Sequence, residues 1–152
     1  MADKLIIEIF REKNAEEFTK ALAAPDSRLE TGSAAAMTAA VAMSLAARAA
    51  AACDQSGEKA QYIARNIETL RGYMVHLIDE DVKSRGPLRR AIKEGDARTI
   101  EAARQPAVCI DQEIINMMGQ ALELIAGLAE ICPKDSMHYV GEAAELAFAA
   151  IR

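Results

Sequence analysis

The sequence predicts an all-α protein, an up-and-down bundle of long antiparallel helices with an alanine-rich helix at its centre. Three observations support this fold class. Apolar residues recur at three- and four-residue spacing, and no segment shows the period-two alternation of a strand. Glycine and proline fall between these apolar segments. Most positions from 33 to 53 are alanine, the residue with the highest helix propensity.

The chain is expected to begin with a short helix, followed by the alanine-rich one. Asn14 and Glu17 match a capping box, which predicts a helix that continues through Ala23. The alanine-rich helix is predicted over Ser33–Cys53, with its first serine or Thr31 as the N-cap. Because alanine side chains are short, another backbone can approach this helix closely. We therefore expect it at the centre of the bundle or at a subunit interface.

A long amphipathic helix is predicted next, over Glu58–Arg85. Gly86–Pro87 is expected to interrupt it, because proline removes a backbone hydrogen bond and suits the first turn of a new helix. The new helix would be short, covering Leu88–Glu94, and would stop at Gly95.

Three more helices are expected in the second half of the chain. Asp96 can cap a short helix through Arg104, Pro106 can open a long helix to about Ile131, and Ser136 can cap the last helix. One face of the long helix is expected to carry Val108, Ile115, Met118, Leu122 and Ile125. Its apolar surface is wider than one bundle can easily cover, so we expect a homodimer with helix-on-helix contacts.

Composition limits the function classes. The 152 residues fit one domain, 1–152, with room for a sizeable core. A net charge of −5, a pI near 5.1 and the lack of a basic face argue against a nucleic-acid partner. The N-terminal apolar run is flanked by acids and does not match a signal peptide. The alanine-rich helix carries Arg48, and alanine contributes little to membrane insertion, so we expect no membrane span.

Three widely spaced cysteines, Cys53, Cys109 and Cys132, lie on or at the ends of apolar helical segments. This pattern predicts reduced, buried thiols without an obvious pairing geometry, and hence a cytoplasmic protein. The sequence has no CxxC or CxxxH spacing, so we expect no thiolate zinc site.

The densest group of ionisable residues is the run from His76 to Asp81. Asp81 falls beside the apolar stripe of its helix, where a carboxylate is shielded from water and can act as a general acid or base. The alternative is a solvated acidic patch with Asp81 at its edge. A metal site at His76 and Glu80 is disfavoured, because bundle-type metal sites need Glu-x-x-His pairs from several helices.

Two further groups could receive an anion. Gly32 and Ser33 stand where backbone N–H groups and the helix dipole favour negative charge, although a simple cap would look the same. A loose basic group lies near the predicted bend at Gly86–Pro87, where a solvated face is the alternative; its members are Arg71, Arg85, Arg89 and Arg90.

Taken together, these segments resemble a known family. The order is a turn ending in Gly-Ser, an alanine-rich helix, a long helix bearing IDEDV, and a terminal YVGEAAELAFAAI. Over about residues 14–152 this resembles the formiminotransferase-cyclodeaminase C-terminal domain and the related methenyltetrahydrofolate cyclohydrolases. The resemblance implies an all-helical dimer with a folate cleft at the subunit interface. It also implies conversion of formiminotetrahydrofolate to methenyltetrahydrofolate with release of ammonia, or hydrolysis of methenyltetrahydrofolate to formyltetrahydrofolate.

The chain departs from the family pattern at three places. The family's Pro-Gly-Gly-Gly-Ser reads Leu29–Ser33 here, and only its last two residues match. The family's Asp-x-x-Ala-Phe falls on Asp81, with Ser84 and Arg85 in place of Ala-Phe. In the family's Ser-Asp-x-Gly-x-Ala on the last helix, Gly141 and the following Ala match, but the Ser and Asp do not.

These departures have physical consequences. Glu30 and Thr31 in place of glycine are expected to narrow the turn or repel an anionic folate tail. Tyr139 stands where the family has its Asp, so a candidate proton carrier is absent there.

The resemblance implies a folate one-carbon enzyme acting at the methenyl or formimino carbon, with Asp81 as the catalytic acid or base. Gly32, Ser33 and Gly141 would bind the substrate, a tetrahydrofolate derivative. No metal and no tightly bound cofactor are expected. Two alternatives stay open: a catalytically degenerate relative that binds another small molecule or a protein partner, and an unrelated helical scaffold.

Overall fold

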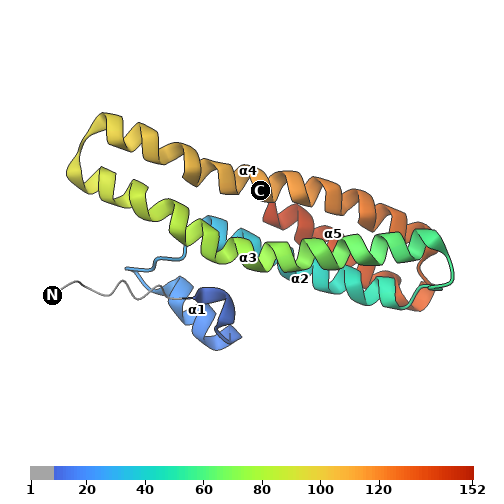
Figure 1. Cartoon of the computed structure of the whole chain (residues 1–152). Helices are drawn as coiled ribbons and strands as arrows, with labels where there is room; N and C mark the ends of the chain where they lie inside the picture. The colour runs from blue at the N-terminus through green and yellow to red at the C-terminus, as the bar shows by residue number, and fades with distance from the viewer. Residues whose placement is uncertain (1–8) are drawn as a thin grey trace.

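A computed structural model describes residues 9–152, which form helices and contain no strand (Figure 1). The α-helices are α1 (Ala15–Ala23), α2 (Thr31–Ala51), α3 (Glu58–Glu94), α4 (Ala97–Ile131) and α5 (Met137–Ala150). Two 3-10 turns, η1 (Phe10–Glu12) and η2 (Lys134–Ser136), precede α1 and α5. The predicted all-α fold class is confirmed. Most of the N-terminal apolar run lies outside the described residues.

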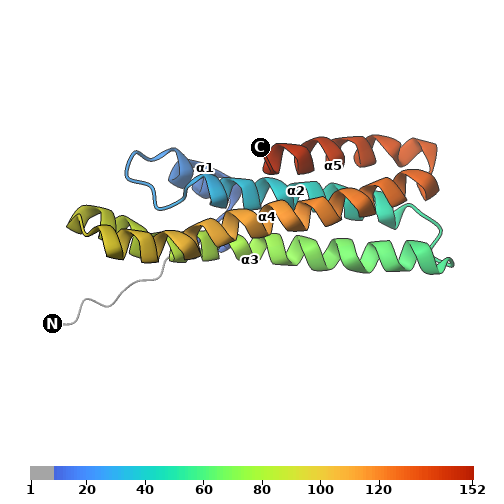
Figure 2. The same ribbon diagram turned by 90° about the horizontal axis from the view of Figure 1, so that it is seen from above.

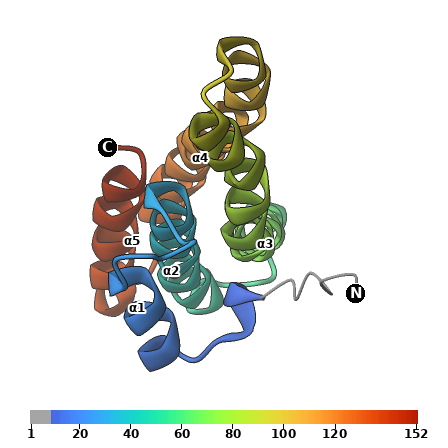
Figure 3. The ribbon, with the colours of Figure 1, turned by 90° about the vertical axis from the view of Figure 1, so that its left-hand side faces the viewer.

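The helices from α2 to α5 run alternately up and down, and α2 is the central one. Seen end-on, α2 lies between α3, α4 and α5, while α1 lies to one side (Figure 3). Seen from above, the long helices lie lengthwise beside one another (Figure 2). Alanines are buried along the length of α2, from Ala36 to Ala50, together with Met43. The prediction of a central alanine-rich helix is confirmed, because short side chains let three helices approach α2 at once.

Local rules place most helix ends correctly. The Asn14 carboxamide oxygen accepts the Glu17 N–H at 2.9 Å, as the capping box predicts. The Asp96 carboxylate accepts the Thr99 N–H at 3.1 Å at the start of α4. Gly95 ends α3 in the left-handed region, with φ of 76°.

The two predicted proline breaks are wrong. α3 continues through Pro87 to Glu94, and α4 continues from Ala97 through Pro106 to Ile131. A proline inside a helix costs about 3 kcal/mol, but α3 and α4 pack against each other, and this packing keeps each helix continuous. The resulting hairpin extends past the start of α2 (Figure 1).

The predicted inner face of α4 is partly wrong. Val108 and Ile115 are 43% and 48% exposed, whereas Met118 and Ile125 are buried as expected. Ile114 and Leu128 complete the buried stripe. α4 therefore keeps apolar side chains on its outer surface.

Two helices, α2 and α4, are long and apolar enough to cross a membrane by length and composition alone. Core helices of soluble proteins pass the same test. The central position of α2 in the bundle accounts for its apolar composition.

Candidate functional site

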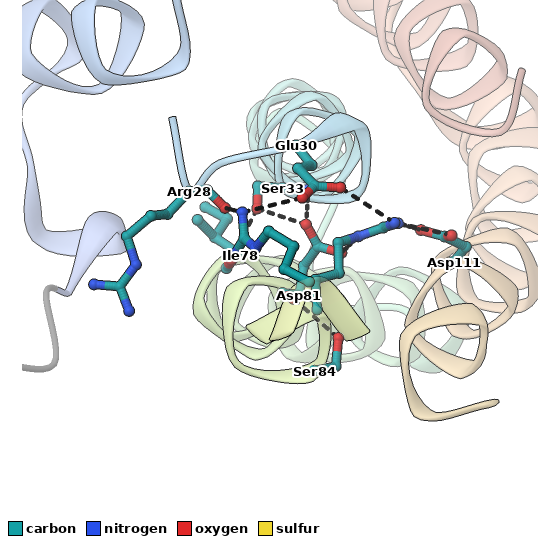
Figure 4. A network of polar contacts seen from close by, with 9 residues as sticks. Arg28, Glu30, Ser33, Ile78, Asp81, Ser84 and Asp111 are labelled. Atoms are coloured by element: carbon teal, nitrogen blue, oxygen red, sulfur yellow. Dashed lines mark hydrogen bonds and ion pairs between the residues drawn. The ribbon is translucent and has the colours of Figure 1, made fainter. Parts of the chain in front are cut away.

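The start of α2 is held by a carboxylate from another helix. Glu30 is the N-cap residue and makes no side-chain cap hydrogen bond, so the prediction of Thr31 or Ser33 as cap is wrong. Instead the Ser33 N–H donates to Asp81 Oδ2 on α3 at 2.8 Å, and the Ser33 hydroxyl lies 2.7 Å from the same oxygen (Figure 4). The helix start does bind an anion. That anion belongs to the chain itself.

Asp81 is completely buried, with 0% of its surface exposed. Its second carboxylate oxygen, Oδ1, accepts the Nε–H of Arg85 at 2.6 Å. Both oxygens are therefore engaged, as a buried charge requires. The alternative of a solvated acidic patch with Asp81 at its edge is wrong.

Arg85 links three carboxylates. Its Nη2 donates to both oxygens of Asp111 on α4 at 2.9 Å, and its Nη1 lies 3.4 Å from Glu30 Oε2. Burial opposes the charged form of Arg85, but its hydrogen bonds to Asp81 and Asp111 and their negative charges raise its pKa above the ordinary value. The Arg85 side chain is only 15% exposed, so it is not part of a solvated basic face.

The predicted basic group divides between separate partners. Arg89 Nη1 donates to Glu30 Oε1 at 3.0 Å and to the Arg28 carbonyl at 3.3 Å. Arg71 instead pairs with Glu68 on its own helix. Glu30 thus contacts two guanidinium groups, and its charge is compensated rather than free to repel a ligand.

Gly32 permits this close packing. An added Cβ at Gly32 would lie 2.3 Å from Asp81 Oδ1 and 2.9 Å from Asp111 Oδ1. No other residue fits without displacing a carboxylate. The groups that approach the Gly32 backbone closely are therefore the chain's own carboxylates.

A groove of about 440 Å³ opens beside this network, between α2, α4 and α5. Gly32, Asp111 and Ile115 line it, together with Thr31, Ala34, Ala35, Thr38, Ile114, Ala149, Ala150, Ile151 and Arg152. Asp81 is not in the lining. It lies behind Gly32 and the Arg85–Asp111 pair, so a molecule in the groove meets Gly32 and Asp111 first.

The other ionisable residues of the run from His76 to Asp81 contact η1 or one another. Asp79 is buried, and its Oδ1 accepts the Phe10 N–H at 2.7 Å. Among residues 9–152, Asp79 Oδ2 accepts no hydrogen bond, and Arg11 Nε lies 3.5 Å from it. His76 Nδ1 lies 3.0 Å from Arg11 Nη1, and His76 Nε2 lies 3.6 Å from Glu80. These groups position η1 on α3.

Comparison with known proteins identifies the fold and the family. The family model described as formiminotransferase-cyclodeaminase matches residues 14–152. The chain belongs to this family. A solved structure of formiminotetrahydrofolate cyclodeaminase from Thermotoga maritima superposes with a TM-score of 0.84 at 19% sequence identity, covering 91% of this chain and 73% of that one. At this identity the likeness shows the fold. No curated protein matches the sequence.

The structure brings together three of the four predicted site residues. Gly32, Ser33 and Asp81 meet at the start of α2. Gly141 lies apart, exposed in the second turn of α5, whereas the opposite end of α5 lines the groove. Sequence reasoning missed Asp111, which looked like an ordinary surface charge.

Glu30 and Arg85 are two departures from the family pattern, and they contact each other. Their opposite charges were the one indication in the sequence that these positions are paired. In this member of the family, the substituted turn and the substituted residue on α3 form a single salt-bridge network.

Proposed function

We propose that the chain binds a reduced one-carbon folate in the groove at the start of α2 and acts at its formimino or methenyl carbon. The observation that carries the proposal is the groove itself, which is lined by Gly32 and by Asp111, the carboxylate that pairs with Arg85. Family membership supports the substrate class. The tetrahydrofolate derivative is the substrate, and the proposal requires no metal and no tightly bound cofactor.

Either reaction needs proton transfer near the one-carbon unit. Asp81 is the proposed acid or base, and Arg85 separates it from the groove. The outer contacts of Arg85 go to Asp111 and Glu30, whose side chains are 43% and 35% exposed. Ion pairs with exposed groups are weak. A ligand that displaces them would give Asp81 access to the groove.

A second copy of the chain is the proposed cover for this region. Val41, Ile115 and Phe148 are between 45% and 48% exposed and belong to the three helices that form the groove. Exposed apolar side chains on the helices that form one groove favour burial against a partner. Sedimentation at micromolar concentration should give a homodimer. A mass equal to one chain would count against this interface.

A second candidate function has its own observation. Both oxygens of Asp81 are engaged, and the Glu30–Arg85 pair closes the turn that the family keeps open with glycine. These contacts favour a relative that keeps the fold but has lost the reaction, and that binds another small molecule or a protein.

The decisive measurement is the loss of near-ultraviolet absorbance by methenyltetrahydrofolate. The wild-type chain should accelerate this loss, and Asp81→Asn should abolish the acceleration while leaving folate affinity within about tenfold. Asp135→Asn, in η2 at the other end of α5, is the matched control and should behave as wild type. Formiminotetrahydrofolate, with ammonia release as the readout, tests the second reaction.

An opened variant separates the two candidates. Glu30→Gly, Thr31→Gly and Arg85→Phe together restore the three glycines of the family turn and the family's Phe on α3. The degenerate relative would be supported if this variant binds tetrahydrofolate derivatives while the wild-type chain shows neither turnover nor heat of binding on titration. Absence of binding by both proteins would overturn the folate proposal.

Gly141 stays a proposed substrate contact. An added Cβ there meets nothing within 4 Å, so Gly141→Ala should fold normally. Weaker folate binding by this variant would then report a ligand contact, and unchanged binding would remove Gly141 from the site.

A further inference from the structure

Two cysteines meet at the end of the bundle opposite the groove. The Cys53 thiol donates to the Ala49 carbonyl at 3.4 Å, and the Cys132 thiol reaches the same carbonyl at 3.9 Å. The residues are far apart in sequence, but the C-terminal ends of α2 and α4 lie at the same end of the molecule (Figures 1 and 2). All three cysteines are free thiols, as the sequence predicts, and the shared carbonyl brings two of them together, which their spacing in the sequence does not indicate.

The three thiols differ in access. Cys53 is buried, with 6% exposed, Cys132 is half-buried, and Cys109 is exposed on α4, which corrects the expectation of three buried thiols. Burial and then the neighbouring Cys132 raise the pKa of the Cys53 thiol. A small reagent therefore reaches Cys132 before Cys53.

Both cysteines lie just beyond the last residue of a helix. Cys53 follows the C-cap Ala52 of α2, and Cys132 is itself the C-cap of α4, with extended backbone angles. Neither residue is fixed in the middle of a helix. The Ala49 carbonyl also accepts the Ala52 N–H at 3.1 Å, so it keeps a hydrogen bond if both thiol donors are lost.

We propose that Cys53 and Cys132 are a redox modification site, which a low-molecular-weight disulfide converts into an intramolecular disulfide. The proposal is independent of the proposed function.

The reaction proceeds in two exchanges. The Cys132 thiolate attacks one sulfur of the reagent, the S–S bond of the reagent breaks, and one reagent thiolate leaves. Cys53 then attacks the Cys132 sulfur of this mixed disulfide, and the second reagent thiolate leaves. The two protons of the cysteines end on the two released thiols. The protein pair is oxidised and the reagent disulfide is reduced, so atoms and electrons balance.

The test uses the reduced full-length chain with Cys109→Ser, treated with oxidised glutathione. The expected product has lost the mass of two hydrogen atoms, carries no glutathione, and yields a peptide linking Cys53 to Cys132. It should unfold at a higher temperature than the reduced chain, because the crosslink restricts the unfolded state.

Single variants test the order of events. In the same background, Cys53→Ser should accumulate one glutathione adduct at Cys132, whereas Cys132→Ser should leave Cys53 unmodified. Separate adducts on both cysteines, a crosslink between two chains, or two unreacted thiols in the Cys109→Ser chain would each overturn the proposal.

Discussion

The two parts of α2 are stabilised in opposite ways. At its start, Gly32 and Ser33 contact the buried carboxylate of Asp81, which Arg85 neutralises. From Ala36 onward the buried side of the helix consists of alanines and Met43, which pack against apolar side chains of α3, α4 and α5. The first part depends on a few directed polar contacts, and the second on many small apolar contacts.

The two parts of α2 should therefore respond differently to substitution. Removal of one member of a buried charge network leaves its partners unsatisfied, so a single change affects the whole start of α2. In the alanine-packed part, each contact is weak alone. The stability there should instead be sensitive to added side-chain volume.

The largest effect is expected from Asp81→Ala. This change leaves Arg85 with fewer partners and the Ser33 N–H without an acceptor, so the free energy of unfolding should fall by about 3–5 kcal/mol. Urea unfolding followed by circular dichroism measures it. Asp111→Ala is the control, because Asp111 also contacts Arg85 but its side chain is 43% exposed, and it should cost about 1 kcal/mol or less. An equal loss of unfolding free energy in the two variants would show that the contribution of Asp81 to stability does not depend on its burial.

Ala42→Leu tests the packed part of the helix. Ala42 is 0% exposed, so three extra carbon atoms should lower the free energy of unfolding by about 3 kcal/mol through overpacking. Ala51→Leu, at the exposed last residue of α2, should change it by less than about 0.5 kcal/mol. An unchanged melting temperature for Ala42→Leu would mean that this face is loosely packed.

Gly32→Ala tests the close packing at the start of α2 with a single methyl group. The new Cβ collides with the carboxylates of Asp81 and Asp111, and we expect a loss of about 2 kcal/mol. Gly119→Ala is the matched control in an exposed part of α4, where an added Cβ meets nothing within 4 Å. It should instead stabilise the protein by about 0.5–1 kcal/mol. Stabilisation by both changes would contradict the close approach at Gly32.

The smallest effect is expected from Ser33→Ala. Asp81 loses one hydroxyl donor but keeps the backbone N–H of residue 33, so thermal unfolding should report a loss of about 1 kcal/mol. Ser44→Ala is the comparison, because Ser44 is exposed and its hydroxyl donates to the Ala40 carbonyl of its own helix. That variant should match or slightly exceed wild-type stability, since alanine is the better helix former. A larger loss of stability in Ser44→Ala than in Ser33→Ala would contradict this prediction.

Sequence reasoning succeeded where the cause is local. The caps at Asn14 and Asp96 and the stop at Gly95 depend on residues within one turn, and the central place of α2 follows from alanine itself. The predicted breaks at Gly86–Pro87 and Pro106 failed because packing between α3 and α4 outweighs the local cost of proline.

The site could be predicted only in part for a similar reason. Asp81 stood out through its place beside an apolar stripe and its match to a family motif. Its acceptor role toward Ser33 spans 48 residues, and the Arg85–Asp111 contact spans 26. Helical periodicity carries no information about such pairs, so the network at the start of α2 became visible only in three dimensions.

The contact between Glu30 and Arg85 also sets an order for evolutionary change. Arginine at 85 can be accepted alone, because Asp81 and Asp111 already pair with it. Glutamate at 30 without that arginine would add a third acid beside Asp81 and Asp111, with Arg89 as its remaining partner. We therefore expect Glu30 to depend on Arg85 more than Arg85 depends on Glu30. Arg85→Phe should accordingly be tolerated better in a Glu30→Gly background than in the wild-type chain.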